Sequence, residues 1–137
     1  MPGLKDIPGP HVIEVPVAGQ ATAATPDEFA IGTAPFNAVV TGVAFIPKST
    51  LTGANTNYCS VTLRNRGAAG SGSTNIAQTD YVSTVNATAF VANAVTLNAT
   101  TANRNVTAGD VLTCEKLVTG TGLAMPAGTI EVTLQAR

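Results

Sequence analysis

Charged side chains are scarce in this chain of 137 residues. They make up 11% of the sequence, and 7 Lys and Arg against 8 Asp and Glu leave a net charge of -1. An average soluble domain has about 25% charged residues. Binding to nucleic acid depends on neutralising phosphates with a basic stripe, whereas the few cations here are spread along the whole chain. We therefore expect no nucleic-acid partner.

Groups that support catalysis are also few. His11 is the only histidine, and a Ser-His-Asp or Cys-His site built on it would rest on an extended segment after Pro10. Neither a GxxxxGK[ST] nor a GxGxxG motif occurs. Cys59 and Cys114 stand apart, with no CxxC pair and no second histidine to complete a zinc site. We predict that the protein is not an enzyme and has no catalytic residue, cofactor or metal site.

Long apolar runs are missing as well. No segment approaches the roughly 18 residues of a membrane span, and the opening residues MPGLKDIPGP lack the basic and apolar regions of a signal peptide. We expect no membrane partner and no export by a signal of the chain's own. Without an export signal, two buried free thiols are favoured over a disulfide.

Small and β-favouring residues are abundant instead. The sequence holds 22 Ala, 21 Thr, 15 Val, 13 Gly and 10 Asn, which leaves few of the Glu, Lys and Leu residues that build exposed helix faces. Apolar residues alternate with polar ones in short segments separated by Gly, Asn and Pro. These patterns predict strands over 11–17, 37–46, 58–64, 76–83, 90–97, 111–118 and 129–136.

The fold class that these segments predict is all-β. We expect an antiparallel β-sandwich, jelly-roll-like, formed by residues 11–137 as a single domain, preceded by an extended N-terminal arm over residues 1–10 in which prolines fix the backbone. Residues 67–73 should form a loop, and residues 84–92 allow at most two helical turns. Asp27 and Glu28 follow Pro26 in a turn-like TPDE, and Asp110 should fix the turn that opens its strand.

Three segments carry a resemblance to a known class of proteins. They are VTGVAFIPKSTLTGANTN at 40–57, AGDVLT at 108–113 and GTGLAMPAGTIEV at 120–132. In order and spacing they resemble the small head proteins of tailed bacteriophages, the decoration or cement proteins of the outer capsid. The resemblance implies a homotrimer on the virion surface, assembled in the host cytoplasm and bound to the major capsid protein.

The resemblance therefore implies a structural virion protein that decorates a phage capsid and stabilises it. The alternative is a head-fibre or tail-associated module that recognises a glycan on the host surface. A charge-poor face is cheap to desolvate, and an extended arm can add contacts with a neighbour. The residues that we expect to bind the capsid lie in and beside the arm: Leu4, Lys5, Asp6, Ile7, Pro8, Pro10, Val12 and Ile13.

Overall fold

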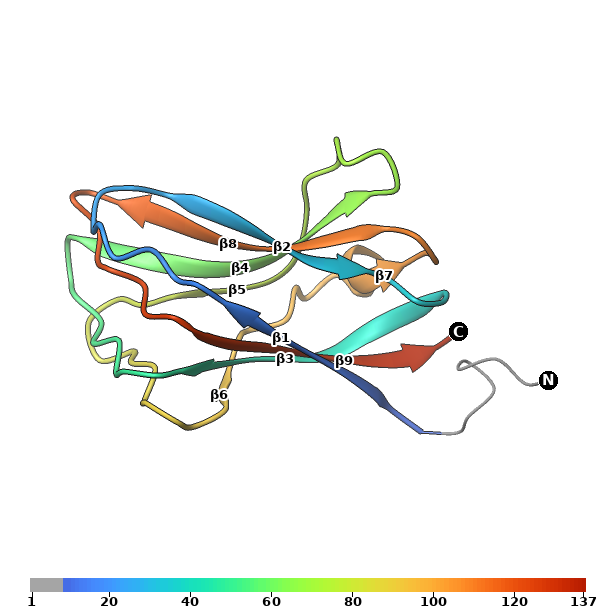
Figure 1. Ribbon diagram of the computed structural model, residues 1–137, viewed down its shortest axis with the longest axis horizontal. Coiled ribbons are helices and arrows are strands. Elements are labelled where there is room, and N and C mark those ends of the chain that lie inside the picture. The colour runs from blue at the N-terminus through green and yellow to red at the C-terminus, as the bar shows by residue number, and fades with distance from the viewer. Residues whose placement is uncertain (1–8) are drawn as a thin grey trace.

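Two antiparallel sheets face one another in the computed structural model, which describes residues 9–137 (Figure 1). The first sheet has the strand order β1 (His11–Val17), β9 (Gly128–Ala136), β3 (Ala38–Pro47) and β6 (Asn93–Ala94), and β7 (Asn105–Val106) also pairs with β3. The second sheet has the order β2 (Asp27–Thr33), β8 (Val111–Thr119), β4 (Tyr58–Gly67) and β5 (Thr74–Asp80). The helical structure within the described residues is a short 3-10 turn at Thr101–Arg104. The all-β sandwich predicted from the sequence is confirmed.

The core lies between the sheets and follows the alternation of the strands. Val132 and Leu134 of β9 and Val61 and Leu63 of β4 belong to one buried apolar cluster that both sheets supply. Successive side chains of a strand point to opposite faces, so each of these strands gives every second residue to the core. Burial of apolar surface, at about 25 cal/mol per Å², is what holds the two sheets together.

Most of the predicted strands are present, and two predictions need correction. The segment 90–97 was expected to be a strand, but only Asn93–Ala94 pair with β3. The residues Asp27 and Glu28, expected in a turn, instead begin β2 and pair with β8. No α-helix forms over 84–92. The hairpin loop at 67–73 is confirmed and extends beyond the second sheet, as Figure 1 shows in light green.

A buried lysine fastens the connection between β1 and β2. Lys116 lies on β8, and its side chain is fully buried on the inward face of the second sheet. Its Nζ donates hydrogen bonds to the backbone carbonyls of Thr22, Ala23 and Thr25, at 2.8, 2.9 and 3.0 Å. Desolvation lowers the pKa of this ammonium group, although nearby Cys59 opposes the shift. The lysine therefore serves as an internal clamp on the loop.

The turn before β8 is fixed by a carboxylate. Asp110 accepts hydrogen bonds through Oδ2 from the Thr107 backbone at 2.9 Å and from Asn65 Nδ2 at 2.8 Å. These bonds tie the turn to β4, the strand next to β8 in the second sheet. The role predicted for Asp110 is confirmed.

Both cysteines are free and buried, as the sequence predicts. Cys59 lies on β4 and Cys114 on β8, and both belong to the core cluster. Burial raises the pKa of Cys114 to about 12 and also raises the pKa of Cys59. Neither thiol is therefore available as a nucleophile in the folded protein.

Candidate docking surface

Charged residues are divided unequally between the two sheets. Within the described residues, the strands of the first sheet carry only Glu14 and Glu131, apart from the histidine at the start of β1. The strands of the second sheet carry Asp27, Glu28, Arg64, Arg66, Asp80, Glu115 and Lys116. The two outer faces of the sandwich therefore differ in chemistry, and the face of the first sheet is poor in charge.

The outer face of the second sheet satisfies its own charges. Arg66 donates to both carboxylate oxygens of Glu28, and Arg64 donates to Glu115. The hydrogen bond from Arg66 is the largest cause of the lowered pKa of Glu28. The outward residues Ser60 and Thr62 of β4 are buried on this face. This face is consequently a closed polar layer.

The outer face of the first sheet is built from rows of residues that the strand register places side by side. One row joins Glu14, Glu131 and Ala44, and the next joins Pro16, Thr129 and Ile46. Residues directly opposite in neighbouring strands share a face of the sheet. Apart from the two glutamates, these rows contain small, apolar or uncharged side chains.

The large apolar side chains that remain exposed all belong to this sheet and the loop that enters it. Among the described residues they are Val12, Phe90 and Val91, with exposed fractions of 53%, 79% and 49%. Val12 is on β1, and Phe90 and Val91 lie in the loop before β6, separated from it by Ala92. The loop that carries Phe90 and Val91, yellow to orange in Figure 1, lies below the first sheet on the side away from the core. Phe90 and Val91 are adjacent in the chain, and a contiguous exposed apolar patch of this kind is typical of an interaction surface.

The loop that carries Phe90, residues 88–93, is held in a fixed shape. The Asn93 side chain donates to the carbonyls of Phe45, Thr88 and Val91 at 3.1, 3.0 and 2.7 Å, and its Oδ1 accepts from the Thr88 backbone at 3.0 Å. The Phe90 amide donates to the Pro47 carbonyl at 2.9 Å. Phe90 has a φ of 58°, a left-handed conformation that is costly for a residue with a side chain. The bonds around the loop hold the aromatic ring outward despite this cost.

A hollow of about 370 Å³ lies beside Phe90, where β1 and β3 end and β9 begins. Pro16, Ile46 and Pro47 line it, together with Phe90 itself and Thr129. Lys48 also borders this hollow, and it lines a neighbouring hollow of about 380 Å³ as well. An apolar knob and an apolar hollow are therefore adjacent on this face.

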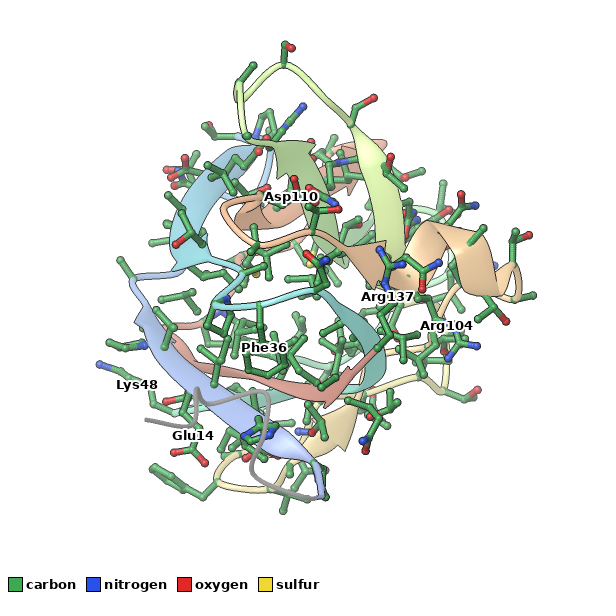
Figure 2. The ribbon with its side chains drawn as sticks, turned by 90° about the vertical axis from the view of Figure 1, so that its right-hand side faces the viewer. Glu14, Phe36, Lys48, Arg104, Asp110 and Arg137 are labelled. Atoms are coloured by element: carbon green, nitrogen blue, oxygen red, sulfur yellow. The ribbon has the colours of Figure 1, made fainter. Side chains whose placement is uncertain are left out.

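Glu14 and Glu131 form a pair of like charges on the same face. They lie directly opposite one another in the β1–β9 register. The hydrogen bond to Glu14 is the largest cause of the raised pKa of Glu131. Neither glutamate, nor Lys48, makes an ion pair within the part of the chain that the structure describes. In Figure 2, Glu14 and Lys48 both point outward on the side of β1.

The residues predicted for the arm are only partly within the structure. Leu4, Lys5, Asp6, Ile7 and Pro8 lie outside the described residues. Pro10 is exposed and leads into β1, Val12 points outward, and Ile13 packs against the core. Of this group, Pro10 and Val12 are therefore the residues that the structure shows exposed.

A further hollow lies at the end of the sandwich where β1 begins. It has a volume of about 490 Å³ and is lined by Pro35, Phe36, Asn37, Ala108 and Arg137. The His11 ring meets Phe36 edge-on, with 5.0 Å between the ring centres. Figure 2 shows Phe36 and Arg137 at this end. The first residues of the described chain therefore start next to a concave surface.

Comparisons of the chain with protein-family models, with curated proteins and with solved structures found no match. Among residues 9–137, no three His, Cys, Asp or Glu side chains gather in a way that could hold a metal ion. The same residues include no helix with the length and apolar character needed to cross a membrane. The candidate site is therefore the outer face of the first sheet, with its exposed apolar side chains. Sequence reasoning expected strand at Phe90 and missed its exposure.

Proposed function

We propose that the chain is a structural protein of a tailed-bacteriophage particle, which decorates the outer surface of the capsid and stabilises it by binding the major capsid protein. The observation that supports this proposal is the contrast between the two outer faces. The second sheet pairs its own charges, as expected of a face turned to water. The first sheet leaves Val12, Phe90 and Val91 exposed. A protein that binds a shell on one side and meets water on the other needs one face of each kind.

In this proposal the capsid contact is centred on Val12, at the end of the first sheet where the arm joins β1. Val12 shares its row with Thr133 and Gly42, so a partner meets no charged side chain in that row. The arm residues 1–10 add to the same contact. The strand order, in which β1, β9, β3 and β6 face β2, β8, β4 and β5, supports the jelly-roll form of the sandwich as part of the proposal. The homotrimer implied by the resemblance belongs to it as well.

The test is occupancy on purified particles. Deletion of residues 1–10 and the substitution Val12→Asp should each lower the amount of protein bound per capsid, because both remove apolar contact and the second adds an unpaired charge. Ala69→Asp is the matched control, since Ala69 is exposed in the hairpin loop beside the second sheet. Full occupancy by both variants, with circular dichroism unchanged, would contradict docking at Val12.

A glycan-binding module remains the second candidate, favoured by the hydrogen-bonding side chains of the second sheet. Gln78 lies between Asn75 and Asp80 in a chain of side-chain hydrogen bonds of 2.9 and 2.8 Å. Amide and carboxylate groups of this kind can bind sugar hydroxyls. Copy number separates the two candidates. Gel densitometry should find hundreds of copies per particle for a decoration protein, whereas about a dozen would favour a fibre or tail module.

A further inference from the structure

The end of the first sheet that carries Phe90 has two complementary shapes on one patch. Phe90 projects with 79% of its surface exposed, and the hollow beside Pro16 and Pro47 lies next to it. The hydrogen bonds of Asn93 fix the loop, so the Phe90 ring is preorganised for binding. A surface that holds both a projecting side chain and a hollow can bind another copy of itself, because the side chain of each copy can fill the hollow of the other.

The charges of the same patch are complementary in the same way. Lys48 borders the hollow, while Glu14 and Glu131 lie one row away, two residues along their strands from Pro16 and Thr129. None of the three makes an ion pair within the described residues. Between two copies, a lysine of one can lie between the two carboxylates of the other and relieve their repulsion.

We propose that this patch docks against a second copy of the chain, with Phe90 of one copy entering the hollow of the other and Lys48 pairing with Glu14 and Glu131 across the contact. The contact lies at the opposite end of β1 from Val12. It is therefore compatible with capsid binding, and it stands whether or not the partner at Val12 is a capsid protein. Reciprocal exchange gives a dimer, and the same contact repeated around an axis gives a larger ring.

Sedimentation of the purified full chain across micromolar to submillimolar concentrations tests this contact. The wild type should show a mass that rises above the 13.8 kDa of one chain. Phe90→Asp should weaken association at least about tenfold, because the buried ring is lost from every contact. Ala69→Asp adds the same charge in the hairpin loop and should leave association unchanged. Circular dichroism of each variant controls for folding.

Charge reversal then tests the partner residues. Lys48→Glu and Glu14→Lys should each weaken association, whereas the double variant should regain it, because it restores an opposite pair across the contact. A wild type that stays at the mass of one chain, or an assembly that Phe90→Asp does not weaken, overturns the inference. If Phe90→Asp lowers capsid occupancy while the free protein is monomeric, the Phe90 patch contacts the capsid. That outcome overturns self-docking and leaves the proposed function standing.

Discussion

The buried clamp formed by Lys116 allows a quantitative test of how the fold is held together. Its ammonium group donates to three backbone carbonyls in the loop between β1 and β2. Lys116→Met keeps the apolar stem and removes the charge and the donors. Hydrogen bonds from a charged group contribute about 1.5–3 kcal/mol each, so three amount to about 5–9 kcal/mol.

Two effects reduce this loss. The three bonds share one ammonium group, so their contributions are not additive and their sum is an upper bound. Thr22 and Thr25 are exposed, so water can reach part of the loop when the lysine is gone. We therefore expect Lys116→Met to lower the free energy of unfolding by about 2–4 kcal/mol.

Urea denaturation followed by circular dichroism measures this change. Lys48→Met is the matched control, because Lys48 is exposed, and it should change the free energy of unfolding by less than about 0.5 kcal/mol. Both variants should be made in a Phe90→Asp background, so that contacts between copies do not contribute. A Lys116→Met variant as stable as its parent would refute the clamp.

Three further outcomes are expected. Glu131→Gln should stabilise the protein at neutral pH by up to about 1 kcal/mol. The pKa of Glu131 is raised in the folded state, so the folded protein loses stability as the pH rises through that pKa. In acid, where Glu131 is protonated, the wild type and Glu131→Gln should therefore be equally stable. Equal stability of the two proteins at neutral pH would contradict this prediction. An alkylating reagent should leave both buried cysteines unmodified in the native protein and label both in urea without reductant, whereas a disulfide would protect them until reduction. Gly53→Ala should destabilise the fold by about 1–3 kcal/mol in urea titrations. The reason is that the new Cβ would lie 1.9 Å from the Val82 carbonyl oxygen. Unchanged stability would contradict this close approach.

The strands that sequence reasoning predicted well are those whose alternation agrees with their burial. Ile130, Val132 and Leu134 alternate with polar residues, and β9 forms with these three side chains buried. The strand β2 was missed because Pro26, Asp27 and Glu28 have the composition of a turn. Pairing with β8 and the ion pair from Arg66 to Glu28 nevertheless support an extended conformation there. This support comes from residues far away in the sequence, which local patterns do not register.

The candidate surface was harder to predict than the fold. The alternation in β8 does place Lys116 on the same side as Leu112 and Cys114, so its burial left a signal in the sequence. Phe90 left none. Its segment has the composition of a strand. Hydrogen bonds from the Asn93 side chain and from the Phe90 amide to the Pro47 carbonyl hold it instead in a turn that exposes the ring.

The unequal distribution of charge has a consequence for how a partner can bind. A sheet can pair with another chain through the free edge of its outermost strand, and β1 is such an edge. Pro16 lacks an amide donor and interrupts a regular ladder there. A partner of the first sheet therefore gains more from its outer face, where Val12 and Phe90 are exposed at opposite ends of the sheet, than from its edge. Docking through a face leaves the paired charges of Arg64 and Arg66 on the second sheet turned to water, where they keep the other side soluble.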